Sequence, residues 1–168
     1  MGRAIYIANV LGLDMGMFYK RRDYTRIVNG RNPIVAHEFL GTSVEGKDMI
    51  IIDDMISSGD TIIKIASLLK EKGAGRVYIC STFGFFTDGL DKFDDAYKKG
   101  YFDKLLTTNL VYQSPELLEK PYYISCDMSK YIALIIDTLN HDTSVSHLLN
   151  PVDRIKRCVT NYMSQHEK

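Results

Sequence analysis

Two adjacent carboxylates, Asp53 and Asp54, follow a fully apolar run within residues 47–61, KDMIIIDDMISSGDT. Ionised carboxylates only accept hydrogen bonds, so they suit sugar hydroxyl groups, or Mg²⁺ bound directly or through water. A strand that leads into a capped helix would explain the serines and the glycine of this stretch. It would not explain two adjacent acids directly after an apolar strand, so the pair marks a candidate site.

A small polar loop follows the acids and opens a predicted helix. Helix N-termini present free N–H groups and a partial positive charge, which suits a phosphate. The hydroxyl groups add donors, and glycine lets the backbone approach an anion closely. A carboxylate beside that phosphate would be repulsive unless it turned away as a helix cap. Acids and loop together predict a site for a phosphorylated sugar. The loop residues are Ser57, Ser58, Gly59, Asp60 and Thr61.

A basic segment, residues 20–32, holds five basic residues and one acidic residue, whereas residues 45–60 hold five acidic residues and one basic residue. Phosphoryl transfer depends mainly on positioning and charge stabilisation, so a basic loop that closes over an acidic pocket would suit a polyphosphate and exclude water. Taken alone, Lys20-Arg21-Arg22 is more typical of a solvated turn than of a catalytic loop.

The elements that must position these residues alternate between strand and helix, which predicts an α/β fold with a parallel sheet and helices on both faces. Ligands of such sheets bind at the carboxyl ends of the strands, where the acids lie. We predict a mobile loop over residues 20–36. Predicted strands are residues 13–19, 49–52, 76–83, 104–108 and 121–125, and predicted helices are residues 3–11, 60–72, 88–99, 127–140 and 151–163.

The stretch IIIDDMISSGDT resembles the phosphoribosyl-pyrophosphate-binding motif of type I phosphoribosyltransferases. Within that superfamily, roughly residues 2–150 are most similar to the C-terminal part of the ribose-phosphate diphosphokinase (phosphoribosyl pyrophosphate synthase) family. Residues 2–23 resemble its helix, strand and basic flexible loop, Thr107-Thr108-Asn109 its strand end, and SVSHLL, residues 144–149, its C-terminal signature. Residues 83–102 are longer and less similar, and their role is open.

The resemblance implies a truncated phosphoribosyltransferase-like domain over residues 1–150 and a C-terminal helical extension over residues 151–168. It implies transfer of diphosphate from ATP to ribose 5-phosphate, which makes phosphoribosyl pyrophosphate. Asp53 and Asp54 would hold the ribose hydroxyls, with Mg²⁺ as cofactor, and the loop 57–61 would cradle the 5-phosphate. Lys20 and Arg22 would lie on the catalytic loop and stabilise charge on the transferred group, so beside this motif we favour a catalytic role for them.

The family's N-terminal half supplies much of its ATP site, and nothing in the sequence resembles that half. We therefore expect a piece of a longer protein that lacks full synthase activity alone, and that assembles as a homo-oligomer. A phosphoribosyltransferase that consumes phosphoribosyl pyrophosphate, or a non-catalytic nucleotide-binding or regulatory module of the same fold, would share the acidic pair and the loop.

Composition excludes several other classes. The 168 residues carry 21 basic and 21 acidic side chains, so no overall nucleic-acid-binding surface is expected. No apolar run approaches the roughly 18 residues of a membrane span. The three cysteines are widely separated, which fits a reducing compartment, and we expect a cytoplasmic protein. The four histidines have no partner at metal-ligand spacing.

Overall fold

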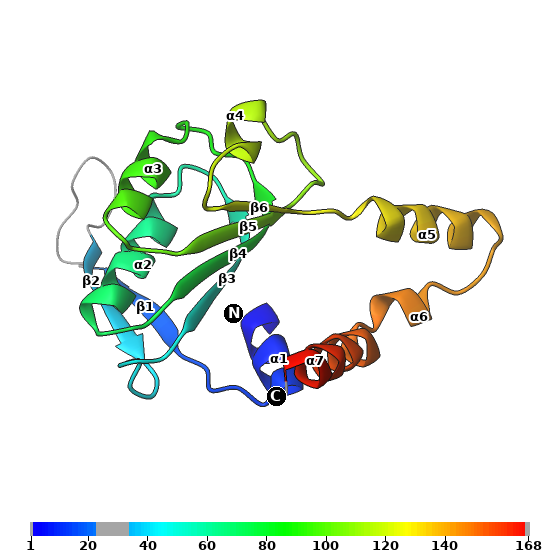
Figure 1. Ribbon diagram of the computed structural model, residues 1–168, viewed down its shortest axis with the longest axis horizontal. Helices are drawn as coiled ribbons and strands as arrows, with labels where there is room; N and C mark the ends of the chain where they lie inside the picture. Colours follow the sequence, from blue (N-terminus) through cyan, green and yellow to red (C-terminus); the bar gives the residue numbers. More distant parts are fainter. Residues whose placement is uncertain (1, 23–33, 167–168) are drawn as a thin grey trace.

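The computed structural model describes residues 2–22 and 34–166, and its elements alternate between helix and strand along most of the chain (Figure 1). The first elements are α1 (Gly2–Leu11), β1 (Met17–Arg22), β2 (Ile34–Leu40), β3 (Met49–Ile56), α2 (Asp60–Glu71), β4 (Val77–Gly84) and α3 (Asp91–Lys98). The others are β5 (Lys104–Thr108), α4 (Pro115–Leu118), β6 (Tyr123–Cys126), α5 (Ser129–Asn140), α6 (Ser146–Leu149) and α7 (Val152–His166). Of the helices described, none has both the length and the apolar character that crossing a membrane requires.

Four parallel strands form the central sheet, in the order β3-β4-β5-β6. Helices α2 and α3 cover one face, and α1 lies against the other face with α7 beside it (Figure 1). This arrangement confirms the predicted α/β fold. Because every strand of this sheet runs the same way, the carboxyl ends of β3, β4 and β5 meet at one edge.

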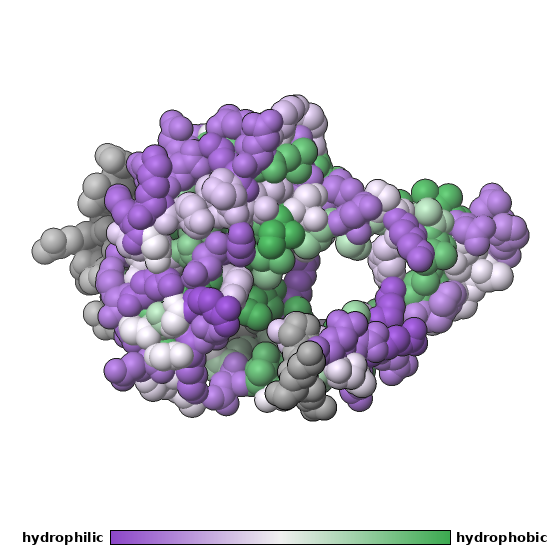
Figure 2. All heavy atoms as spheres, in the orientation of Figure 1, coloured by the Kyte–Doolittle hydropathy of each residue, from purple (hydrophilic) through white to green (hydrophobic). Residues whose placement is uncertain are grey.

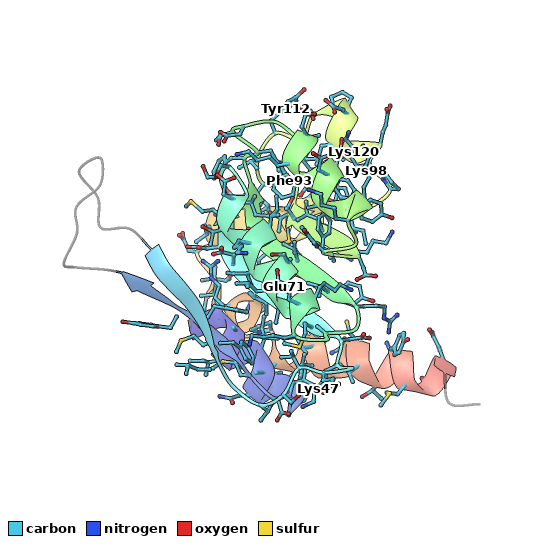
Figure 3. The ribbon with its side chains drawn as sticks, turned by 90° about the vertical axis from the view of Figure 1, so that its left-hand side faces the viewer. Lys47, Glu71, Phe93, Lys98, Tyr112 and Lys120 are labelled. Atoms are coloured by element: carbon cyan, nitrogen blue, oxygen red, sulfur yellow. The ribbon has the colours of Figure 1, made fainter. Side chains whose placement is uncertain are left out.

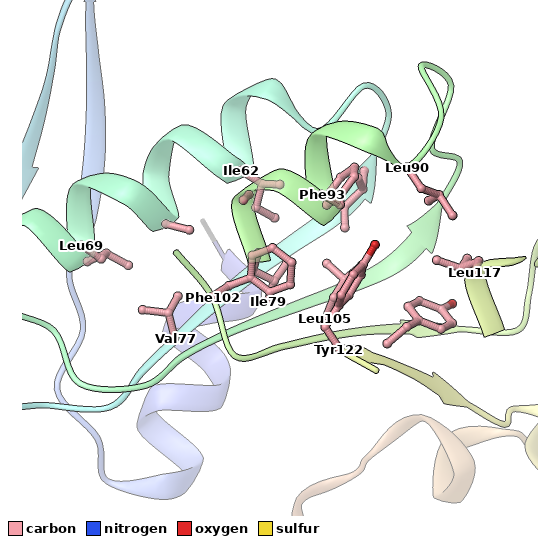
Figure 4. Packing of buried hydrophobic residues seen from close by; sticks show 14 of the residues in the cluster. Ile62, Leu69, Val77, Ile79, Leu90, Phe93, Phe102, Leu105, Leu117 and Tyr122 are labelled. Carbon is pink, nitrogen blue, oxygen red and sulfur yellow. The ribbon is translucent and has the colours of Figure 1, made fainter. Parts of the chain in front are cut away.

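The hydrophobic core lies between this sheet and helices α2 and α3 (Figure 4). Alternate residues of β4, such as Val77 and Ile79, are fully buried on that side, as the two-residue period of a strand requires. Phe93 of α3 is also fully buried, and with Ile62 of α2 it fills the space above the sheet (Figure 4). The core therefore ties α3 firmly to α2 and the sheet.

Residues 17–22 and 34–40 form an antiparallel hairpin, whereas the sequence predicted a loop over residues 20–36. That prediction is wrong at both ends, and residues 23–33 lie outside the described residues. The ring centroids of Phe18 and Phe39, opposite each other in the hairpin, are 5.1 Å apart. Cross-strand pairs of this kind stabilise a hairpin. The two strands were missed because the stretch between them, residues 23–33, is much longer than a hairpin turn, and its Asn29-Gly30 was interpreted as part of a loop.

Helices α5 and α6 extend away from the sheet, and α7 returns to pack on α1 (Figure 1). The Tyr131 hydroxyl donates to the Leu148 carbonyl at 2.7 Å, and the Arg154 guanidinium carbon lies 5.1 Å from the centre of the Tyr131 ring. In the space-filling view the body and this arm enclose an opening, with apolar surface on the body's side of it (Figure 2).

Candidate functional site

The acidic pair lies within β3 rather than directly after it. The sequence predicted a strand that ends at Ile52, but pairing with β4 continues through Met55 and Ile56. Backbone pairing does not depend on hydropathy, so the change from apolar to acidic residues did not mark the end of the strand. Both carboxylates are exposed near the carboxyl end of β3, where a ligand of a parallel sheet is expected.

The two carboxylates differ in how readily they hold a proton. The Asp54 backbone N–H donates to Asp53 Oδ1 at 2.8 Å. Partial desolvation and the neighbouring carboxyl raise the pKa of Asp53, whereas the hydrogen bond with Asp53 and the nearby Arg3 help to lower the pKa of Asp54. A proton is therefore held more readily on Asp53 than on Asp54, and the pair accepts a cation more readily as Asp53 ionises.

A cavity of about 540 Å³ lies between α1, α7 and strands β3–β5, and Asp53 is part of its wall. Arg3 of α1 also lines it and donates from Nη1 to Thr82 Oγ1 at 3.2 Å. The remaining wall is mostly apolar, with Tyr6 and Cys80 among its residues. The cation of Arg3 and the carboxylate of Asp53 therefore line one cavity, on the face of the sheet where α1 and α7 lie.

Arg3 is a residue that the sequence analysis missed. Arg3 lies in α1, a helix of mainly apolar residues, and its proximity to Asp54 depends on how α1 packs on the sheet. A single arginine in an otherwise uncharged helix, GRAIYIANVL, was the available signal.

The small polar loop connects β3 to α2 and is held by the segment that follows β4. The Phe85 N–H donates to the Ile56 carbonyl at 2.8 Å, and the Thr87 N–H donates to the Ser57 carbonyl at 3.1 Å. The hydroxyl oxygens of Ser57 and Thr87 are 3.3 Å apart in a further hydrogen bond. These contacts fix the loop at the same end of the sheet as the acidic pair.

Gly59 is required by the shape of the loop. Its φ of +86° lies in the left-handed region, and a Cβ built there would stand 2.2 Å from Cζ of the buried Phe93. Gly59 directly precedes α2, so the N-terminal N–H groups of that helix open beside it. The structure therefore places Ser57, Ser58, Gly59, Asp60 and Thr61 together at a helix N-terminus, as the sequence predicted.

Asp60 does not accept a capping bond from the helix backbone in the way the sequence suggested; it forms an ion pair with α3. Lys92 Nζ donates to Asp60 Oδ1 at 2.8 Å and to Asp88 Oδ2 at 3.0 Å. The Ser58 hydroxyl donates to Asp60 Oδ2 at 3.0 Å. The bond from Lys92, then the bond from Ser58, lower the pKa of Asp60, so this carboxyl is ionised at neutral pH.

Lys20 and Arg22 lie in β1 and not in the loop that the sequence predicted. In the register of the hairpin, Lys20 is opposite His37. The part of the chain between β1 and β2, residues 23–33, lies outside the described residues. The catalytic role of Lys20 and Arg22 therefore stays a prediction.

Asn109, part of the predicted strand-end motif, is engaged in capping the start of α5. Its Oδ1 accepts from the Met128 N–H at 2.8 Å, and its Nδ2 donates to Asp127 Oδ1 at 2.8 Å. Asp127 Oδ1 also accepts from the Ser129 N–H at 2.9 Å. These bonds anchor the long arm to the carboxyl ends of β5 and β6.

A magnesium ion at this site would have few protein ligands. Among residues 2–22 and 34–166, no group of three or more His, Cys, Asp or Glu is arranged to hold a metal ion. Mg²⁺ needs no such cage, because it keeps several waters and is bound by one or two carboxylates plus substrate phosphates. Asp53 and Asp54 fit that pattern.

A family model described as the phosphoribosyl synthetase-associated domain matches residues 28–150. Proteins named ribose-phosphate pyrophosphokinase are similar to the chain. The one from Vibrio parahaemolyticus is 30% identical over 149 residues, which is 88% of this chain and 44% of that protein. The one from Shewanella oneidensis is 32% identical over 149 residues, with the same shares, and the one from Thermococcus kodakarensis is 34% identical over 110 residues, 65% of this chain and 35% of that protein. The chain thus spans less than half the length of these relatives.

The fold has a counterpart among solved structures. The phosphoribosylpyrophosphate synthetase from Mycobacterium smegmatis superposes with a TM-score of 0.66 at 23% sequence identity. The match covers 84% of this chain and 43% of that protein. At this identity the similarity establishes the fold, and the site must be argued from its residues.

Proposed function

Because the chain belongs to the family of the phosphoribosyl synthetase-associated domain, we propose that it forms the ribose-phosphate-binding part of a ribose-phosphate pyrophosphokinase. One observation carries the proposal: within the matched region, Asp53 and Asp54 precede the Ser57–Thr61 loop at the N-terminus of α2. Carboxylates for sugar hydroxyls and a helix N-terminus for a phosphate stand on one edge of one sheet.

In the proposed reaction, the 1-hydroxyl oxygen of ribose 5-phosphate attacks the β-phosphorus of ATP. The bond between that phosphorus and the α,β-bridging oxygen breaks, AMP leaves, the hydroxyl proton passes to solvent, and phosphoribosyl pyrophosphate forms. Asp53 and Asp54 hold the ribose hydroxyls, and the loop N–H groups hold the 5-phosphate. Bound Mg²⁺ supplies positive charge that offsets the phosphates.

Lys20 and Arg22 are proposed to stabilise charge on the transferred diphosphoryl group. Both residues lie in the second half of β1, next to the connection that leads to β2. Lys20→Ala should lower synthase activity of the native protein by at least ~10²-fold, the range for removal of one charge-stabilising donor. Full activity after that change would exclude the catalytic role.

The binding proposal is tested by calorimetric titration of this chain with ribose 5-phosphate, with and without Mg²⁺. Binding should occur, and it should be lost in the double variant Asp53→Asn plus Asp54→Asn. Asp137→Asn plus Asp142→Asn, at the far end of α5, removes the same charge and should leave binding unchanged. No binding by the unchanged chain would refute the proposal and favour a non-catalytic module.

We further propose that the protein is cytoplasmic and that it assembles as a homo-oligomer.

A further inference from the structure

Asp60 is an unfavourable residue in a phosphate-binding loop. It stands in the first turn of α2, and its carboxyl is ionised at neutral pH. An anion facing a phosphate dianion at short range repels it, and it competes for the same positive helix end. A loop that binds a phosphate therefore needs this charge to be offset.

Lys92 of α3 is placed to offset it. Its ammonium bridges Asp60 and Asp88 at 2.8 and 3.0 Å, and the hydrogen bond with Asp60, followed by the bond with Asp88, raises the pKa of Lys92. Lys92 and Asp60 are thus both charged at neutral pH. The Ser58 hydroxyl holds the second oxygen of Asp60, so the carboxylate is fixed by two donors.

The contact adds little to folding. Lys92 and Asp60 side chains are 43% and 66% exposed, and pairs this exposed contribute little to stability. The position of α3 is secured separately, because buried Phe93 packs directly over Gly59. Because Phe93 and the backbone bonds secure α3, removal of the ion pair should leave the fold intact.

We propose that Lys92 is a positioning residue that acts through Asp60: it holds the carboxylate against α3 and offsets its charge, so that the loop accepts the phosphate of a sugar phosphate. The inference rests on the proposed function and adds to it a residue from the less similar segment 83–102. It predicts that affinity for the phosphate depends on the pair, while the fold does not.

The test measures the dissociation constant of ribose 5-phosphate for the full chain by calorimetry at low salt. Lys92→Ala should weaken binding roughly tenfold, because one exposed negative charge is left beside a dianion. Lys92→Arg should keep most of the affinity. Lys92→Ala combined with Asp60→Asn should recover it, and Lys99→Ala, which removes a cation from the other end of α3, should change nothing.

The salt dependence of binding is a second measurement, and it would not change if the role of Lys92 were only structural. The loss caused by Lys92→Ala should shrink as ionic strength rises from about 0.05 to 0.5 M, because screening shortens the reach of the charge. Thermal unfolding checks that each variant keeps its fold.

Three results would count against the inference. If Lys92→Ala binds as tightly as the unchanged chain, Lys92 has no such role. If Asp60→Asn fails to restore binding to the Lys92→Ala variant, the effect does not pass through Asp60. If the unchanged chain does not bind ribose 5-phosphate, the proposed function is wrong, and so is this inference, which rests on it.

Discussion

Replacing Gly59 by alanine tests whether the loop is shaped by its contact with α3. The backbone at Gly59 has φ +86°, and the new Cβ would lie 2.2 Å from Cζ and 2.6 Å from Cε2 of Phe93. Contacts this short require something to shift. Phe93 is fully buried in the hydrophobic core, so its ring has little room to move. Figure 3 shows its place on α3 among the other side chains.

Two costs add up in this variant. A left-handed backbone conformation costs an L-residue about 1–2 kcal/mol. Overpacking of a filled core costs a further ~1–3 kcal/mol. Gly59→Ala should therefore lower the free energy of unfolding by roughly 2–5 kcal/mol, which most domains, with about 5–15 kcal/mol of stability, survive.

Urea unfolding followed by circular dichroism measures this loss, and Gly46→Ala is the matched control. Gly46 has φ +69°, but a Cβ there meets no atom within 4 Å, so that variant pays only the backbone cost. The difference between the two variants isolates the clash. In a Phe93→Leu background, which lacks Cζ, the cost of Gly59→Ala should fall toward that of Gly46→Ala.

Equal losses for Gly59→Ala and Gly46→Ala would refute the argument, because the ring would then have given way without cost. The same conclusion would follow if Phe93→Leu left the cost of Gly59→Ala unchanged.

Three further outcomes follow from single contacts. Tyr122 is almost fully buried and donates to Asp94 Oδ1 at 2.7 Å, so Tyr122→Phe should cost about 1–2 kcal/mol in urea unfolding. Desolvation raises the pKa of Asp94, but its hydrogen bonds with Lys120 and Tyr122 outweigh that effect and lower the pKa. The stability that Asp94 contributes is therefore lost as pH falls below 3.8. Over that pH range, Tyr122→Phe should lose less stability than the unchanged chain. Burial, then the neighbouring Asp54, raises the pKa of Asp53, so the stability that this carboxyl contributes is present below 3.8 and lost as pH rises through its folded pKa. Asp53→Asn should therefore raise the free energy of unfolding at pH 7 and not at pH 3, by less than about 1 kcal/mol for so exposed a group. Cys158 is exposed whereas burial, then Cys126, raises the pKa of the Cys80 thiol, so a thiol reagent at pH 8 should modify Cys158 first and Cys80 last.

Hydrophobic periodicity predicted the elements that face the core. Of the apolar positions of α2, Ile62, Ala66 and Leu69 are buried and Ile65 is half-buried, and Gly73, directly after the C-cap residue, has φ +84°. Such elements follow from local pattern, because their burial is fixed by a single period. The loop was predicted at the N-terminus of α2, where it lies, because strand, turn and helix are contiguous in sequence; the acids lie inside β3, near its carboxyl end, and not directly after it.

The β1–β2 hairpin and the full length of β3 depend on partners distant in sequence, and neither was predicted. The β1–β2 hairpin needs residues on both sides of a long connection, and its basic end was read as a loop. Strand β3 continues past Ile52 because β4 pairs with it through Gly84. Neither the length of a strand nor its partner is visible in the polarity of its own residues.

The contacts that hold the loop 57–61 come from residues outside the sequence motif, so the site is larger than the motif. The motif contains the groups that contact a ligand, but Gly59 is held by Phe93, Ser57 by Thr87 and Asp60 by Lys92. All three supports come from residues 85–93, in the segment that resembled the family least. A loop built on a helix N-terminus has little rigidity of its own, because its N–H groups point outward to the ligand. Sequence change in α3 can therefore alter the loop's charge and shape while every residue of the motif stays the same.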